Sequence, residues 1–162
     1  LGAGVAKMSS RESRIVDFAG STRFLVGSPD YEAACKVESN EVDLDSLIDE
    51  GYELWPGALE RMACLSAVEI EFELYSEATT IWFDPSLAAS QFTYIERVAV
   101  YERRANARLL PIGGITGTHL MLLLADNGAV YSAFDDYLAC LGATEFEAVS
   151  NIVRAVHVEE CP

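Results

Sequence analysis

In the run Val68-Glu69-Ile70-Glu71-Phe72-Glu73-Leu74-Tyr75, four apolar residues alternate with three glutamates and a tyrosine. Successive side chains of a β-strand point to opposite faces, so this alternation predicts a strand with one buried face and one acidic face. Residues 79–83 follow closely and are rich in β-branched and aromatic residues, which favours a second strand. The two segments are expected to form a hairpin with Ser76-Glu77-Ala78 as its loop.

Two helices are predicted before this hairpin. Apolar residues recur at helical spacing between residues 43 and 50, and Gly51 suits the end of that helix because it lacks a Cβ. Pro56 fits the first turn of a second helix. Further upstream, residues 24–26 suggest a short strand and residues 30–37 a short helix.

After the hairpin, Asp84-Pro85 begins a loop or a helical turn, and a clearer helix is predicted over residues 94–105. Its glutamate lies in the first turn and its arginines in the last, which complements the helix dipole. Leu109 to Gly113 is expected to form an edge strand, because proline cannot donate to a strand ladder. Residues 113–117 are interpreted as a flexible glycine-rich turn.

The last third of the chain predicts a second hairpin and a final helix. Residues 119–125 form a nearly continuous apolar strand, Asn127-Gly128 is a strong turn signal, and residues 129–133 form the return strand. Thr144 and Glu147 have the spacing of a capping box for the final helix. This order predicts an α+β fold, an antiparallel sheet with helices packed on one side. Residues 36–162 are expected to form a single domain, preceded by an N-terminal extension over residues 1–35.

Charge is the most unusual property of the composition. The chain carries 26 acidic and 11 basic residues, a net charge of −15, and the stretch from Val37 to Glu96 holds fourteen acids but only one base, Arg61. A protein with this charge repels nucleic acids and anionic membranes and attracts basic proteins. The alternative is that the charge serves solubility alone.

The residues expected to bind a partner combine carboxylates and aromatic rings. Glu69, Glu71 and Glu73 share one strand face, with Tyr75 and Trp82 nearby as anchors. Asp135 and Asp136 form a second acidic patch beside a tyrosine. The alternatives are a solvated strand face for the glutamates, a core position for each aromatic residue and an exposed turn for the aspartates.

Catalytic, metal and cofactor sites have little support in the sequence. His119 and His157 are the only histidines, and His119 is interpreted as a structural residue at the start of an apolar strand. The carboxylates do not have calcium-loop spacing, and the cysteines Cys35, Cys64, Cys140 and Cys161 do not form a zinc pattern. We expect reduced thiols, a cytoplasmic location, and neither metal nor cofactor. A small acid–base enzyme remains an alternative that a carboxylate with a raised pKa would favour.

Several motifs together resemble the third branch of the SUKH superfamily of immunity proteins, across roughly residues 40–155. They are Asp49-Glu50-Gly51-Tyr52-Glu53-Leu54-Trp55-Pro56, Phe83-Asp84-Pro85, Tyr101-Glu102-Arg103-Arg104, Leu109-Leu110-Pro111-Ile112-Gly113, Asp126-Asn127-Gly128-Ala129-Val130-Tyr131 and Leu141-Gly142-Ala143-Thr144-Glu145-Phe146-Glu147-Ala148. The resemblance implies a bacterial, cytoplasmic, non-enzymatic antitoxin that binds a basic toxin, often a nuclease or a nucleic-acid deaminase. A scaffold or regulatory domain of the same fold that binds an endogenous protein is the alternative. This chain departs from the family at Ala63-Cys64-Leu65-Ser66-Ala67, where an aromatic-Gly-Gly stretch is usual.

Overall fold

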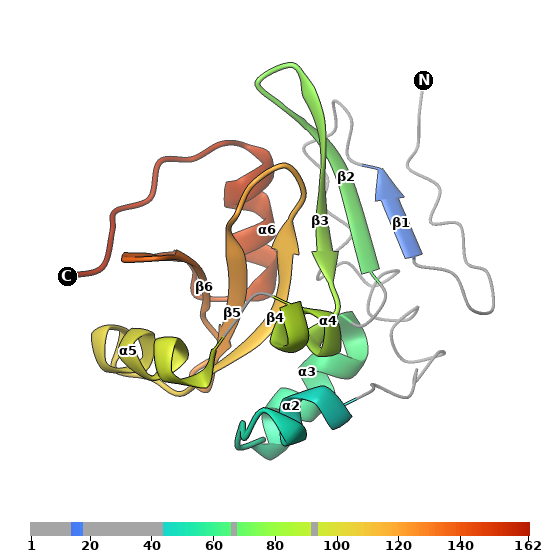
Figure 1. Cartoon of the computed structure of the whole chain (residues 1–162). Coiled ribbons are helices and arrows are strands. Elements are labelled where there is room, and N and C mark those ends of the chain that lie inside the picture. Colours follow the sequence, from blue (N-terminus) through green and yellow to red (C-terminus); the bar gives the residue numbers. More distant parts are fainter. Residues whose placement is uncertain (1–13, 18–43, 66–67, 92–93) are drawn as a thin grey trace.

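The computed structural model describes residues 14–17, 44–65, 68–91 and 94–162, and a seven-stranded sheet dominates it (Figure 1). The strands follow one another in chain order, and neighbours are antiparallel except for β1 and β2, which are parallel. Their bounds are β1 Arg14–Asp17, β2 Val68–Leu74, β3 Glu77–Phe83, β4 Leu109–Ile115, β5 Met121–Ala125, β6 Val130–Phe134 and β7 Tyr137–Gly142. Four residues of the expected N-terminal extension thus join the sheet as β1.

The described helices are α2 Asp45–Asp49, α3 Pro56–Leu65, α4 Pro85–Gln91, α5 Ile95–Ala105 and α6 Glu145–Val153. In Figure 1, α2, α3 and α4 gather at one end of the sheet, and α6 lies against the strands. The predicted α+β class with an antiparallel sheet is confirmed. No described helix is long and apolar enough to cross a membrane. The elements predicted at residues 24–26 and 30–37 lie outside the described residues.

The helix boundaries follow the local signals of the sequence. Gly51 has φ +90° after α2, and Asn106 ends α5 in the left-handed conformation. At α6 the Thr144 hydroxyl accepts a hydrogen bond from the Glu147 amide at 3.1 Å. The Glu147 carboxylate accepts one from the Ala143 amide at 2.8 Å. The capping box therefore forms, with the glutamate reaching one residue beyond its usual target.

The β2–β3 hairpin is tighter than expected. Leu74 pairs with Glu77, so the turn holds only Tyr75 and Ser76, whose φ angles are +50° and +66°. Two positive φ angles are typical of a two-residue turn that matches the strand twist. The prediction of Ser76-Glu77-Ala78 as the loop was wrong, because β3 begins at Glu77.

Strand β4 corrects two predictions, because it lies between β3 and β5 instead of at an edge. The sheet accommodates Pro111 by a shift in the β4–β5 register between Pro111 and Gly113, a local irregularity at which a missing amide donor is tolerated. Gly113 and Gly114 belong to the strand and pair with Phe83 and Trp82, so the predicted turn at residues 113–117 is shorter than expected and begins only after Ile115.

Strand β7 was not predicted, because its run Tyr137-Leu138-Ala139-Cys140-Leu141-Gly142 does not alternate cleanly. It pairs with β6 across a turn at Asp135 and Asp136. The C-terminal segment then returns along its outer edge: Glu160 bridges to Ala139, and the Cys161 amide donates to the Leu138 carbonyl at 2.7 Å.

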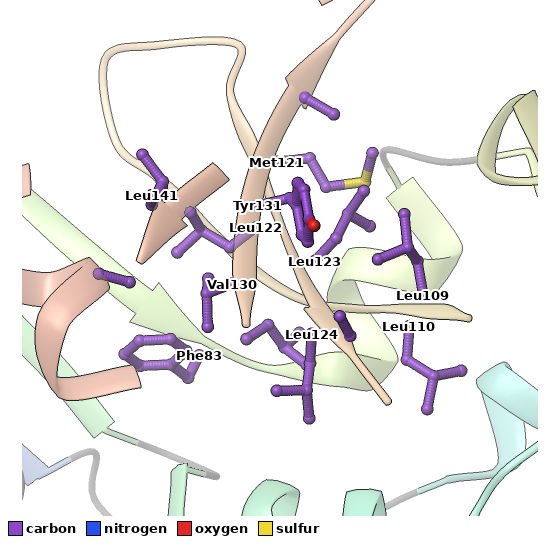
Figure 2. Packing of buried hydrophobic residues seen from close by; sticks show 14 of the residues in the cluster. Phe83, Leu109, Leu110, Met121, Leu122, Leu123, Leu124, Val130, Tyr131 and Leu141 are labelled. Carbon is purple, nitrogen blue, oxygen red and sulfur yellow. The ribbon is translucent and has the colours of Figure 1, made fainter. Parts of the chain in front are cut away.

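The core is continuous across the sheet (Figure 2). All five residues of β5 are buried, and Leu123 and Leu124 are 0% exposed. Helix α6 packs on the sheet at Gly142, where an added Cβ would lie 2.6 Å from the Ala148 nitrogen. This packing holds the sheet in place. The candidate site residues lie on the exposed face of β2 and β3 and at the β6–β7 turn.

Candidate functional site

The acidic row predicted on β2 is Glu69, Glu71 and Glu73. Ile70 and Phe72 between them are 0% and 4% exposed, whereas Glu71 and Glu73 are exposed and Glu69 is half-buried. The three carboxylates therefore share the face opposite the buried residues, with neighbouring Cα atoms roughly 6.5–7 Å apart by strand geometry. We call these three residues the acidic row.

Trp82 lies beside the acidic row. It is the direct antiparallel partner of Glu69, so the two side chains share a face of the sheet. On its other side it pairs with Gly114, where an added Cβ would come within 2.7 Å of the indole Cζ2 atom. The half-buried indole therefore rests directly on the β4 backbone. Tyr75, at the hairpin turn, is 87% exposed.

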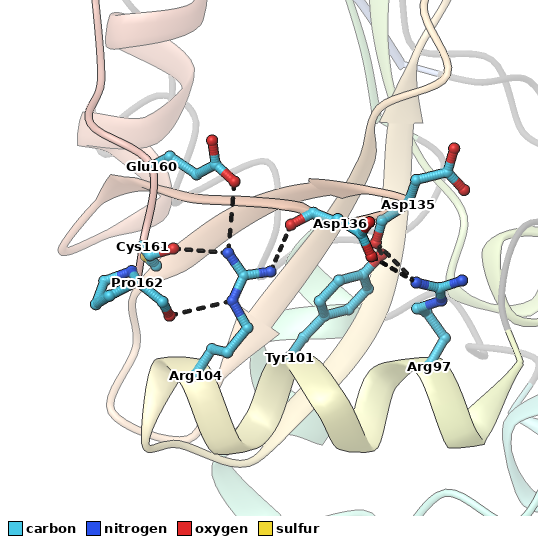
Figure 3. A network of polar contacts seen from close by, with 8 residues as sticks. All are labelled: Arg97, Tyr101, Arg104, Asp135, Asp136, Glu160, Cys161 and Pro162. Atoms are coloured by element: carbon cyan, nitrogen blue, oxygen red, sulfur yellow. Dashed lines mark hydrogen bonds and ion pairs between the residues drawn. The ribbon is translucent and has the colours of Figure 1, made fainter.

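Asp135 and Asp136 do not join the acidic row. They lie in the turn between β6 and β7, and three strands separate β6 from β2. Figure 3 shows that α5 binds this turn: the Tyr101 hydroxyl donates to the Asp135 carbonyl at 2.7 Å, and Arg97 pairs with the Asp136 carboxylate at 3.3 Å. Burial raises the pKa of Tyr101 above its ordinary value. These aspartates form a separate patch that anchors α5.

Arg104 extends the same network to the C-terminal segment (Figure 3). Its guanidinium donates to the carbonyl oxygens of Asp136 at 2.6 Å, Cys161 at 2.6 Å and Pro162 at 3.1 Å. It also lies 3.5 Å from the Glu160 carboxylate. The sequence predicts Arg104 only as a basic residue in the last turn of a helix, because no local pattern shows which carbonyls it reaches.

A groove of about 410 Å³ lies between the α2–α3 connection, α5 and the start of β4. Trp55 lines it, and the Arg108 guanidinium lies 5.3 Å from the centre of the Trp55 ring. Arg108 also pairs with the Glu53 carboxylate at 3.4 Å. This groove was not predicted from the sequence, although Glu53 and Trp55 belong to the motif that carries the family resemblance.

Arg108 and Arg61 are therefore both held in ion pairs, Arg108 with Glu53 and Arg61 with Glu145. Arg61, the only base between Val37 and Glu96, pairs with Glu145 of α6 at 2.7 Å. This pair ties α3 to α6 and neutralises the cation, so the acidic row has no compensating base from its own segment.

The remaining titratable candidates lie at or near the surface, since His119 and Cys140 are exposed and Cys161 is half-buried. The His119 ring stacks on Phe134 with centroids 5.3 Å apart, and His157 is exposed. Cys140 and Cys161 are free thiols, and burial raises the pKa of Cys140. Among the described residues, no group of three or more histidine, cysteine or acidic side chains could hold a metal ion.

Fold and site together define an α+β protein with an antiparallel sheet and an acidic strand face. The model of the SUKH-3 immunity protein family matches residues 36–155, which is most of the chain. The protein therefore belongs to the SUKH-3 immunity protein family, which supports an immunity role, binding to a toxin protein and a non-enzymatic mode of action. No curated protein and no solved structure matches the chain.

Proposed function

We propose that this protein neutralises a toxin that acts on nucleic acids, a nuclease or a deaminase, by covering the toxin's cationic cleft with the acidic row. The observation that carries the proposal is the alignment of Glu69, Glu71 and Glu73 on one face of β2. In this proposal inhibition is by occlusion in the bacterial cytoplasm, and no bond is made or broken.

Electrostatic complementarity supports this choice of target. An enzyme that binds nucleic acid needs lysines and arginines to contact phosphates. The carboxylates of the acidic row repeat at roughly twice the 3.4 Å axial spacing of phosphates on one DNA strand. A linear series of carboxylates can therefore pair with the same lysine and arginine side chains that a nucleic-acid backbone would contact.

The charge distribution also favours rapid association. The net charge of −15 is concentrated in the segment that contains the row. Complementary long-range fields raise association rates to about 10⁸–10⁹ M⁻¹s⁻¹ at low salt, against roughly 10⁵–10⁶ M⁻¹s⁻¹ without steering. Fast capture is useful to an immunity protein because it must bind the toxin before the toxin reaches its substrate.

Growth rescue tests the proposal. The chain is co-expressed with the toxin encoded by the neighbouring gene, as wild type or as the triple variant Glu69→Lys/Glu71→Lys/Glu73→Lys. We expect the wild type to restore growth and the triple variant to fail. A second triple variant, Asp49→Lys/Asp126→Lys/Glu159→Lys, makes the same charge change at exposed positions on other elements and should still rescue.

Equal rescue by both triple variants would contradict the assignment of the acidic row. Circular dichroism and thermal melts of both variants separate a lost interface from a lost fold.

A further inference from the structure

The end of the β2–β3 hairpin projects beyond the strands on either side of it (Figure 1). In the described part of the chain, β1 pairs with β2 only as far as Glu71, and β4 pairs with β3 only over Ile81–Phe83. The last three residue pairs of the hairpin, up to Leu74 and Glu77, therefore join β2 to β3 alone. At about 3.4 Å per residue, these three steps carry the turn roughly 10 Å further out. We call residues 72–79 the finger.

The finger is narrow and negatively charged. Neighbouring strands lie about 4.8 Å apart, and the finger is one pair of strands wide. Glu73 and Glu77 on the finger are exposed, as is Glu71 where it leaves the sheet, and residues 68–83 contain no lysine or arginine. A narrow acidic projection can enter a cationic cleft that a flat face of the molecule could not reach.

Tyr75 lies in the turn at the tip of the finger. Among the described large hydrophobic side chains it is the most exposed, at 87%. Tyr75 and Ser76 both have left-handed backbone, with φ angles of +50° and +66°, which asparagine and glycine adopt far more readily in this kind of turn. Burial does not offset this strain, because the ring lies in solvent. An aromatic residue that strains its turn and adds little to the core indicates a contact with a partner.

We propose that the finger inserts into the nucleic-acid cleft of the toxin and that the Tyr75 ring fills the toxin's nucleobase pocket. Proteins hold an unpaired base by stacking it on aromatic or apolar side chains and by hydrogen bonds to its edge. Tyr75 offers a flat ring with a hydroxyl group, and the carboxylates of Glu73 and Glu77, two residues away on either side, take the place of flanking phosphates. This inference rests on the proposed function and names the part of the toxin that the finger recognises.

The affinity for the toxin encoded by the neighbouring gene, measured by biolayer interferometry, tests the insertion. Tyr75→Ala should weaken binding at least about tenfold, mainly through faster dissociation, as expected for a central aromatic contact. Tyr94→Ala is the matched control, because Tyr94 is 79% exposed at the start of α5, and its affinity should stay within about twofold of wild type. Equal affinities for the two variants would overturn the insertion.

A second variant separates binding from folding. Tyr75→Asn/Ser76→Gly places the favoured residue pair in the turn. Its Tm should equal or exceed that of wild type, whereas its affinity for the toxin should fall at least about tenfold. Wild-type affinity in this variant would show that the ring at the tip is not a binding group.

Neutral nucleosides test the nature of the pocket, because they can fill a base pocket without competing for the side chains that bind phosphates. The four ribonucleosides and the four deoxyribonucleosides are each added at millimolar concentration during the interferometry measurement. We expect at least one of them to weaken the binding of wild type and to leave the residual binding of Tyr75→Ala unchanged. Competition by none of them, or equal competition against both proteins, would overturn the assignment of the pocket.

Failure of this inference and failure of the proposed function give different results. Nucleoside-sensitive binding that depends on Tyr75, together with growth rescue by Glu69→Lys/Glu71→Lys/Glu73→Lys, would retain the inserted ring and reject the role of the acidic row. Growth rescue that depends on the acidic row, together with wild-type affinity in Tyr75→Ala, would retain the function and reject the insertion.

Discussion

Arg104→Ala removes the side chain that fastens the C-terminal segment to β7 and α5. The Arg104 side chain is 22% exposed, and its guanidinium donates to three carbonyl oxygens, at 2.6, 2.6 and 3.1 Å. Two of these carbonyls belong to the C-terminal segment and one to the β6–β7 turn. Loss of the side chain therefore loosens two contacts that α5 makes with the sheet edge.

The expected cost follows from these contacts. A hydrogen bond with one charged partner contributes about 1.5–3 kcal/mol when buried, but these carbonyls lie at a sheet edge where water can replace the guanidinium. The ion pair with Glu160 adds little, because the Glu160 side chain is 55% exposed. We expect a loss of about 2 kcal/mol in the free energy of unfolding, which corresponds to a fall of about 4–8 °C in Tm for a domain of this size.

Urea denaturation of wild type, Arg104→Ala and Arg103→Ala measures this loss. Arg103 is the exposed neighbour on the same helix, so its variant makes the same charge change and should stay within about 0.5 kcal/mol of wild type. Hydrogen exchange of the Cys161 amide, which donates to Leu138, should accelerate only in Arg104→Ala. Equal stabilities for the two variants would refute the anchoring role of Arg104.

Three further predictions concern the fold. Gly142→Ala places a Cβ 2.6 Å from the Ala148 nitrogen, so α6 must shift, and urea unfolding should show a loss of about 1–3 kcal/mol; an unchanged midpoint would contradict this packing. Thr144→Ala removes the acceptor of the Glu147 amide and should cost about 1 kcal/mol in the same assay, which a change below about 0.3 kcal/mol would exclude. Burial raises the pKa of Tyr131 above its ordinary 10.0, so the unfolded phenol ionises first and stability falls as pH rises past that value; Tyr131→Phe should show a shallower fall, and parallel pH profiles for the two proteins would disprove it.

The elements that the sequence predicted correctly have strong local signals. Strand β2 alternates strictly between apolar and acidic residues, and α6 begins with a capping box. Strand β7 has neither signal, since its burial depends on β6 on one side and on the C-terminal segment on the other. The prediction of β4 as an edge strand was wrong, because Pro111 is tolerated in a central strand where the β4–β5 register shifts.

Only part of the candidate site could likewise be predicted from local sequence patterns. Local alternation was enough to place the three glutamates on one face. The strand pairing that puts Trp82 opposite Glu69 and over Gly114 joins residues far apart in the chain, so no local pattern predicts these contacts. Asp135 and Asp136 were predicted as a second acidic patch, and the strand order places them apart from the glutamates.

The decisive measurement is the association rate of the protein with its toxin, followed by stopped-flow fluorescence as ionic strength is raised. For wild type and for the control Asp49→Asn/Asp126→Asn/Glu159→Gln we expect a steep fall with salt. For Glu69→Gln/Glu71→Gln/Glu73→Gln, which changes the net charge equally, we expect a rate at least about tenfold lower at low salt and a flatter dependence. Rates that are insensitive to salt, or that fall equally in both triple variants, would show that the acidic row does not guide the encounter.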